Sequence, residues 1–257
     1  MSIETKSGWL TVIGLGPGKD TWITPAAQHA IANAQDLFGY KPYLDRIPDR
    51  AGQKKFYSDN REELARAREA LTQAAKGRWV GVVSGGDPGV FAMATAVCEA
   101  IDTGPGEWRA IDIRIEPGVT AMLAAAARVG APLGHDFAVI SLSDILKPWS
   151  VIEKRLQLTS EADLAIALYN PASKTRREQI QRAFAVLMTA RGSDTPVVLA
   201  KDIGRSDETV TVTTLGDTDI AQIDMRTLVI VGSSATRVIA RGTDLPLVYT
   251  ERFVEES

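Results

Sequence analysis

A glycine-rich turn, Ser84-Gly85-Gly86-Asp87-Pro88-Gly89, has the residue types best suited to hold a ligand. It follows an apolar run, 79–83, typical of a buried parallel strand, and precedes an alanine-rich segment, 92–100, with helical periodicity. In open parallel sheets, ligands bind at the carboxyl ends of strands, where glycine lets the backbone come close. Asp87 offers one carboxylate, which suits a hydroxyl pair or an ammonium group. The alternative is that Asp87 only caps the next helix, with Pro88 in its first turn.

A second glycine loop, Gly14-Leu15-Gly16-Pro17-Gly18, follows the apolar run 9–13. A dinucleotide-binding turn needs G-x-G-x-x-G opening directly into a helix, but Pro17 interrupts that spacing and the next helix signal is Thr24-Pro25. A phosphate-binding P-loop needs Ser or Thr after its lysine, where this chain has Lys19-Asp20. Both nucleotide motifs therefore fail in detail. The remaining interpretations are a loop whose glycines let the backbone approach a ligand closely and a loop that only reverses the chain direction.

The elements that must position these loops alternate between strand and helix patterns in the first half of the chain. Such alternation predicts a parallel sheet with right-handed crossovers. Asp59 and Glu62 form a capping-box pattern for a helix over 61–75, and the polar segment 41–60 is expected to be an irregular flap. The strands are expected at 9–13, 37–40, 79–83 and 110–115.

Glu116-Pro117-Gly118 breaks this alternation, so we expect domains over 1–116 and 117–257. In the second half, the connections around 209 and 227 are too short for parallel crossovers, which predicts mixed or antiparallel pairing. The fold class is therefore α/β, with two α/β domains, a parallel sheet in the first and a mixed sheet in the second. Strands are expected at 137–142, 163–169, 197–200, 209–213 and 227–231, and helices at 119–129, 149–158 and 175–190.

Composition narrows the possible partners. The 257 residues are 45% apolar and carry a net charge of −3, so nothing attracts the whole chain to nucleic acid or to a membrane. The single cysteine, Cys98, excludes an intramolecular disulfide and suits a reducing cytoplasm, where we expect the protein. With only two histidines, a metal site built from histidine and cysteine is not expected. The first eight residues lack an apolar signal core, and no window of 18 uncharged apolar residues would span a membrane.

Small or polar residues follow several expected strands, at 14–18, 85–90, 117–121, 169–171 and 202–204. These loops alternate between the two halves, which suggests one cleft lined from both. The motifs G-x-G-P-G, G-G-D-P-G, P-G-V-T-A and L-Y-N-P, in this order, resemble the tetrapyrrole (class III) methyltransferases. The resemblance extends from about Trp9 to Tyr249. The tail departs from it, with Glu251-Arg252-Phe253 where the family often has Arg-Gly-Tyr.

The resemblance implies a homodimer that binds S-adenosylmethionine between its two domains and releases S-adenosylhomocysteine. The stretches 132–149 and 168–176 are most similar to members that methylate C17 of a corrinoid precursor and contract its ring in cobalamin biosynthesis, with or without cobalt in the substrate. The cofactor contacts that it implies are Pro17, Gly85, Gly86, Asp87, Val90, Thr120, Ala121, Asn170 and Gly204. No metal, nucleic-acid or membrane site is implied.

Candidate catalytic residues are Ser143 and Asp144, which follow the expected strand 137–142. Ring contraction requires a base for a hydroxyl proton, and burial beside Leu142 and Trp149 would raise the pKa of Asp144 toward working pH. The alternative is that Asp144 caps the helix entered at Pro148-Trp149.

The many carboxylates of a tetrapyrrole substrate require a local basic cluster, because the chain as a whole is acidic. Each such residue is alternatively an ordinary solvated surface charge. Candidates for this role are Lys174, Arg176 and Arg177, followed by Arg205 and Arg237. Two rival functions stay open at this point, namely a nucleotide- or nicotinamide-dependent enzyme and a tetrapyrrole carrier without enzymatic activity.

Overall fold

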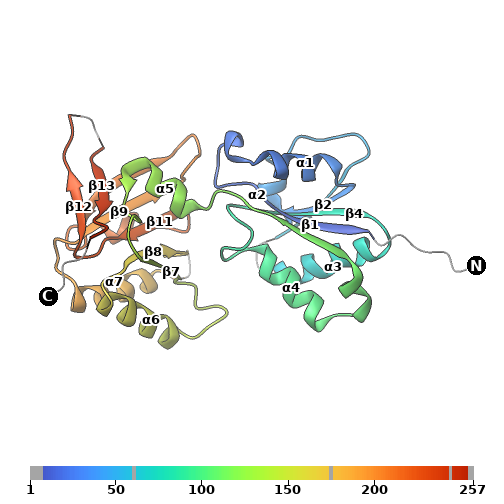
Figure 1. The fold of residues 1–257 in the computed structure, drawn as a ribbon. Coiled ribbons are helices and arrows are strands. Elements are labelled where there is room, and N and C mark those ends of the chain that lie inside the picture. The colour runs from blue at the N-terminus through green and yellow to red at the C-terminus, as the bar shows by residue number, and fades with distance from the viewer. Residues whose placement is uncertain (1–7, 60–61, 174–175, 243–244, 254–257) are drawn as a thin grey trace, which may run out of the picture. The chain divides into compact units, whose positions relative to one another are not determined.

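The computed structural model describes residues 8–59, 62–173, 176–242 and 245–253. The chain divides into two compact units, Met1–Thr120 and Ala121–Ser257, each described here by itself (Figure 1). Within the described residues, no helix combines the length and apolar character needed to cross a membrane.

The first unit is built on a five-stranded sheet with the order β3-β2-β4-β1-β5. All four strand pairs are parallel, as the alternating pattern predicts. The strands are β1 (Trp9–Gly14), β2 (Asp36–Tyr40), β3 (Lys54–Ser58), β4 (Trp79–Ser84) and β5 (Asp112–Glu116). The helices are α1 (Pro25–Asn33), α2 (Lys41–Leu44), α3 (Glu63–Ala75) and α4 (Met93–Thr103), with short 3₁₀ turns η1 (Asp20–Trp22) and η2 (Gly106–Ala110).

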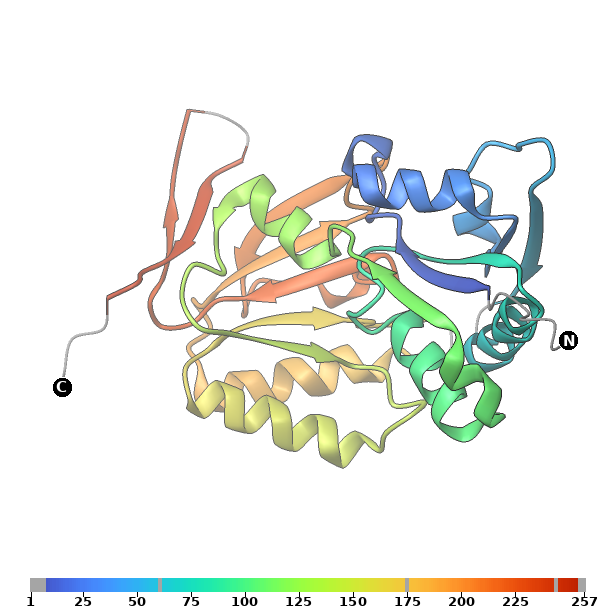
Figure 2. The same ribbon diagram turned by 45° about the vertical axis from the view of Figure 1, so that its right-hand side comes forward.

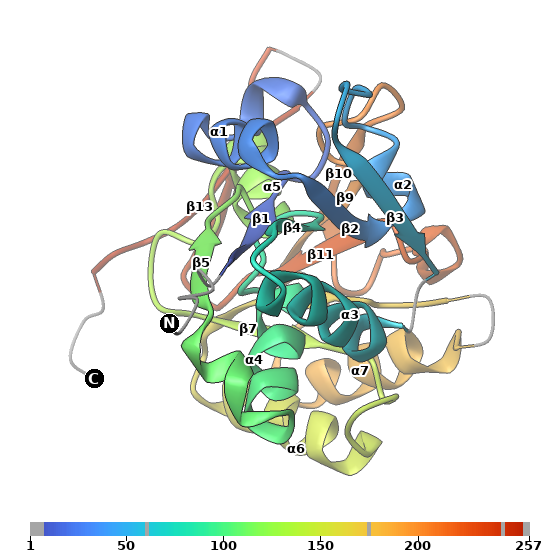
Figure 3. The ribbon, with the colours of Figure 1, turned by 90° about the vertical axis from the view of Figure 1, so that its right-hand side faces the viewer.

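Both faces of this sheet are buried, since neighbouring residues of one strand pack into different clusters. Val12 and Val82 pack with α3 and α4, whereas Ile13 and Val83 pack with residues of α1 and α2. Figure 3 shows α1 on one side of the sheet and α3 and α4 on the other. Continuous apolar runs in β1 and β4 are what a strand buried on both faces requires.

The segment 41–60 is not the irregular flap that its polarity suggested. It holds α2 and the edge strand β3, whose Phe56 ring stacks on Phe38 at 4.5 Å between centroids. The predicted capping box is present only in part, because Glu62 accepts from the Asp59 N–H at 2.8 Å but no side chain caps α3. The predicted start of this helix, at 61, lies outside the described residues. The Thr24 cap of α1 is confirmed, since its hydroxyl accepts from Ala27 N at 3.1 Å.

The second unit contains a mixed sheet with the order β10-β9-β11-β8-β7, which confirms the predicted mixed pairing. Only β7 and β8 pair in parallel, and the other three pairs are antiparallel. These strands are β7 (Phe137–Ser141), β8 (Ala165–Tyr169), β9 (Pro196–Lys201), β10 (Thr209–Thr214) and β11 (Thr227–Val231). The helices are α5 (Ala121–Val129), α6 (Trp149–Glu161) and α7 (Glu178–Ala190), with the 3₁₀ turn η3 (Ile220–Gln222). Helix α7 was expected from 175, which lies outside the described residues.

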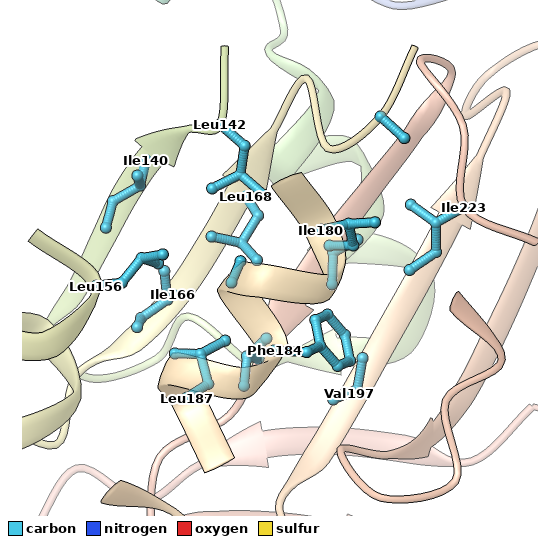
Figure 4. Close-up of a cluster of buried hydrophobic side chains, with 14 of the residues drawn as sticks. Ile140, Leu142, Leu156, Ile166, Leu168, Ile180, Phe184, Leu187, Val197 and Ile223 are labelled. Atoms are coloured by element: carbon cyan, nitrogen blue, oxygen red, sulfur yellow. The ribbon is translucent and has the colours of Figure 1, made fainter. Parts of the chain in front are cut away.

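Helices α6 and α7 cover one face of this sheet, and α5 lies on the other (Figure 2). Leu156 of α6 lies beside Ile166 of β8, and Phe184 of α7 lies beside Val197 of β9, in a single apolar cluster (Figure 4). A second, three-stranded sheet, β12-β13-β6, was not expected from the sequence. Its strands, β6 (Gly130–Ala131), β12 (Thr236–Ile239) and β13 (Leu247–Thr250), are short. Most residues of β6 and β12 are exposed, whereas Val248 and Thr250 of β13 are buried.

Candidate functional site

Two glycine loops meet at the carboxyl ends of the neighbouring strands β1 and β4. Gly16 and Gly86 exchange both of their backbone hydrogen bonds, each N–H donating to the other carbonyl at 3.1 Å. Leu15 N also donates to Ser84 O at 2.9 Å. The sheet order β4-β1-β5 brings these loops together, so residues about seventy positions apart in sequence form one element.

A third loop, after β5, packs against both of them backbone to backbone. A Cβ on Gly118 would overlap the carbonyl oxygen of Gly86 and lie 3.0 Å from Gly14 Cα. A Cβ on Gly14 would lie 2.7 Å from Gly118 N. Gly86 is different, because the nearest atoms to a Cβ there are 3.9 Å away and its φ of +66° is what requires glycine.

Asp87 ties these loops together through both carboxylate oxygens. Oδ1 accepts from Gly89 N at 2.8 Å, and Oδ2 accepts from Gly118 N at 3.0 Å. Helix α4 begins at Met93, with Ala92 at its N-cap and no capping side chain, so the alternative that Asp87 caps this helix is wrong. Each carboxylate oxygen has a further lone pair for a ligand hydroxyl or ammonium group.

The turn after β4 is backed by an aromatic side chain. A Cβ on Gly85 would lie 2.6 Å from Cζ of Tyr43, so the ring occupies the space that a side chain at 85 would need. Tyr43 belongs to α2, in the segment that the sequence analysis took as irregular. The other predicted cofactor residues of this unit are Pro17 and Val90, both half-buried on the loops, and Thr120, which is buried.

In the second unit, the ends of the parallel strands β7 and β8 are joined by polar groups. Asn170 has a φ of +53°, and its amide Nδ2 donates to Ser141 Oγ at 2.9 Å. Leu142 N donates to Tyr169 O at 2.9 Å. The Tyr169 hydroxyl accepts from Met122 N at 2.9 Å, next to the predicted residue Ala121 at the start of α5.

Gly204 lies on a separate turn held by a charged pair. Its φ is +81°, and its N–H donates to Glu208 Oε2 at 2.6 Å. The Glu208 carboxylate also pairs with Arg128 of α5, with 2.5 Å between Nε and Oε1, and this hydrogen bond raises the pKa of Arg128. The pair therefore connects the turn to the last turn of α5.

Asp144 is held by two side chains from the region of α7. Its Oδ2 accepts from Gln179 Nε2 at 2.9 Å, and its Oδ1 lies 3.5 Å from Arg176 Nη1. The Gln179 hydrogen bond and, less strongly, Arg176 lower the pKa of Asp144, although burial opposes them. The predicted increase in pKa is therefore wrong in direction. The capping alternative is also wrong, because Pro148 is the N-cap of α6 and no side chain caps it.

The predicted substrate-binding residues do not form one basic cluster among the described residues. Arg176 is engaged with Asp144 and with Leu142 O, whereas Arg177 is exposed at the N-cap of α7. Arg205 and Arg237 lie near other carboxylates, and Arg237 pairs with Glu251 at 3.1 Å. Lys174 lies outside the described residues. Ser143, the second catalytic candidate, is half-buried, and its N–H donates to Ser141 Oγ at 3.3 Å. In the part of the chain that the structure describes, no group of three or more His, Cys, Asp or Glu residues is placed to hold a metal ion.

The close packing of the glycine loops can be tested by adding one methyl group, through a glycine-to-alanine substitution. Gly118→Ala is expected to lower the free energy of unfolding by about 1–3 kcal/mol, because its Cβ meets backbone atoms that have no room to move. Gly106→Ala is the matched control, since a Cβ there has nothing within 4 Å. Urea unfolding of both variants measures the difference, and equal stabilities would contradict the packing described here.

Comparison with known proteins gives one consistent result. Residues 9–219 match the family model described as Tetrapyrrole (Corrin/Porphyrin) Methylases. Precorrin-3B C(17)-methyltransferase of Sinorhizobium sp is 55% identical over 96% of this chain and 97% of its own length. The crystal structure of the methyltransferase CobJ matches with a TM-score of 0.91 and 47% identity, covering 95% of this chain and 100% of that one.

A more distant structure shares the fold alone. It is uroporphyrin-III C-methyl transferase from Thermus thermophilus, complexed with S-adenosylhomocysteine, with a TM-score of 0.67 and 20% identity over 88% of this chain and 97% of that one. The family match covers well over half of the sequence. The chain therefore belongs to the tetrapyrrole (corrin/porphyrin) methylases.

Proposed function

We propose that this protein transfers a methyl group from S-adenosylmethionine to C17 of precorrin-3B and contracts the ring, as a step of cobalamin biosynthesis. The observation that carries the proposal is the 55% identity to a precorrin-3B C(17)-methyltransferase over nearly the full length of both chains. The TM-score of 0.91 to CobJ supports it for the fold. Membership of a methylase family also favours an enzyme over a tetrapyrrole carrier without activity.

The first unit fits a compact, folded cofactor. Its three glycine-rich loops meet at the strand ends where ligands of parallel sheets bind, and a Cβ on Gly86 would have no described atom closer than 3.9 Å. S-adenosylmethionine supplies a methyl group already activated as a sulfonium, so the chain's own work is to align the acceptor carbon and to exclude water. The uroporphyrin-III methyltransferase that shares the fold has S-adenosylhomocysteine bound. The proposed contacts are those that the family resemblance implies, namely Pro17, Gly85, Gly86, Asp87, Val90, Thr120, Ala121, Asn170 and Gly204.

Binding and product analysis test this proposal together. Calorimetry of the full chain is expected to show binding of S-adenosylhomocysteine but not of NAD or ATP. Incubation with S-adenosylmethionine and precorrin-3B should then add one methyl group, read as a mass gain in the product, and the cobalt-containing analogue serves as the comparison substrate. Cofactor binding without methylation of either substrate would contradict the proposed reaction, and binding of NAD or ATP instead would favour the nucleotide enzyme.

We also propose that the protein is a homodimer, as the family resemblance implies. Exposed apolar side chains on the second unit support this, among them Leu123, Val238 and Ile239, each about half exposed. Sedimentation at micromolar concentration is expected to give about 55 kDa, twice the chain mass of 27.7 kDa. A single species at the mass of one chain would reject the proposal. A cytoplasmic location stays a prediction from the single cysteine.

Asp144, with Ser143 beside it, is our proposed base for ring contraction. If Asp144 accepts the hydroxyl proton, Asp144→Asn should keep its affinity for S-adenosylhomocysteine and lose turnover by roughly a hundredfold or more. Asp112→Asn is the control, because Asp112 forms an exposed ion pair with Arg114 on β5 and should keep normal turnover. Normal turnover of Asp144→Asn would remove Asp144 from the mechanism and leave it the role of holding its loop.

Asp144→Asn should also change how the free energy of unfolding depends on pH. The partners of Asp144 lower its pKa in the folded state, so its ionised form stabilises the fold above the ordinary value of 3.8. As the pH falls through the lowered pKa, the carboxylate is protonated and this contribution is lost. The difference in unfolding free energy between the parent chain and Asp144→Asn should therefore shrink in acid.

A further inference from the structure

Arg46 lies two residues after the end of α2, in a turn held by its neighbours. Leu44 and Ile47 on either side are buried in the cluster under α1 and α2. The backbone N–H of Arg46 donates to Tyr43 O at 3.2 Å, and that of Ile47 donates to Leu44 O at 3.1 Å. The Cα of Arg46 therefore has a fixed position relative to the sheet.

The guanidinium group of Arg46 reaches across to the first glycine loop and binds three of its carbonyl groups. Nη2 donates to Leu15 O at 2.8 Å and to Gly18 O at 2.9 Å. Nη1 donates to Gly16 O at 3.0 Å. Hydrogen bonds from a charged donor are stronger than neutral ones, and the planar guanidinium fixes the direction of each.

These bonds add to those that the loop makes with β4 and the turn after it. The N–H groups of Leu15 and Gly16 donate to Ser84 O and Gly86 O, and Gly16 O also accepts from Gly86 N. Arg46 gives Gly16 O a second donor and also binds Leu15 O and Gly18 O. Gly16 has a φ of +64°, and the carbonyls of Gly16 and Gly18 flank Pro17, a proposed cofactor contact. The Gly16–Gly86 bridge holds the start of this loop, and Arg46 extends the restraint past Pro17 by binding Gly18 O. Without Arg46, the glycine-rich segment that carries Pro17 would have more accessible conformations.

We infer that Arg46 is a positioning residue, which holds the loop around Pro17 in the conformation that binds the cofactor. The inference rests on the proposed function, because it assigns the loop to S-adenosylmethionine. Arg46 acts through backbone carbonyls and not by contact with the ligand. A loop ordered before binding loses less conformational entropy when the ligand arrives, so the arginine contributes to affinity.

The test compares Arg46→Ala with a matched control from the same segment. Arg50 also donates to a backbone carbonyl, from Nη1 to Ala32 O at 2.6 Å, but this carbonyl belongs to α1 and not to the loop. Calorimetry with S-adenosylhomocysteine on the full-length chain is expected to show affinity about tenfold or more weaker for Arg46→Ala and unchanged for Arg50→Ala. Arg46→Lys, which keeps the charge but not the planar fork, should lie between.

Steady-state kinetics separates positioning from a general loss of structure. A loop that holds substrate and transition state alike should raise KM for S-adenosylmethionine in Arg46→Ala and leave kcat within about twofold. Unchanged affinity in folded Arg46→Ala, or an equal loss in Arg50→Ala, would overturn the inference. If Arg46→Ala does not fold, Arg46→Lys is judged by the same criteria. Failure of the parent chain to bind S-adenosylhomocysteine would instead overturn the proposed function.

Discussion

The first unit depends on the backbone contact between three loops at one edge of its sheet. A parallel sheet places the carboxyl ends of β4, β1 and β5 side by side, so their loops must share a small volume. They fit because Gly14 and Gly118 leave no side chain between the backbones, and because Gly86 adopts a conformation that other residues avoid. The loops after β1 and β4 then exchange reciprocal backbone hydrogen bonds, and the loop after β5 packs against both and donates to Asp87.

This constraint explains what the charged residues around the loops do. Asp87 and Arg46 direct their charges at backbone N–H and carbonyl groups of the loops, which hold the loops in place. In the second unit, Glu208 does the same for the turn at Gly204, with Arg128 as its partner. In both units a charged side chain serves the backbone of a loop, and one of them, Asp87, is a residue that the sequence pattern assigned to a ligand. Under the proposed function, the backbone of those loops contacts the cofactor.

The sequence predicts these features unequally, for physical reasons. Buried strands such as β4 show as continuous apolar runs, and loop glycines stand out by their spacing. Strand β3 was missed because it is a polar edge strand, in which Phe56 packs on Phe38. Strands β12 and β13 were missed because each has only four residues, which is too short for an alternating pattern to stand out.

In the candidate site, features that depend on neighbouring residues in the sequence were predicted, and contacts between distant residues were not. The glycines and Asp87 were found from local motifs, but the role of Asp87 was only partly foreseen. Its position before Pro88 imitates a helix cap, whereas its actual partner, Gly118, is 31 residues away. The roles of Arg46 and Tyr43 could not be predicted from the sequence, because their partners are backbone atoms or a glycine on another loop. Every residue type has a backbone carbonyl, so no sequence motif marks such an acceptor. Family resemblance supplied the order of motifs, and only the fold supplied these partners.

The surroundings of Asp144 connect its pKa to substrate binding under the proposed function. Gln179 and Arg176 lower the pKa of this carboxyl, which makes it a weak base in the free protein. Arg176 is also a proposed partner for substrate carboxylates, and one guanidinium divided between two carboxylates stabilises each of them less. A substrate carboxylate that draws Arg176 away would therefore allow the pKa of Asp144 to rise, so that its basicity increases when the substrate is in place. The direction of this coupling follows from the sign of the Arg176 interaction, and it would couple proton removal to substrate binding.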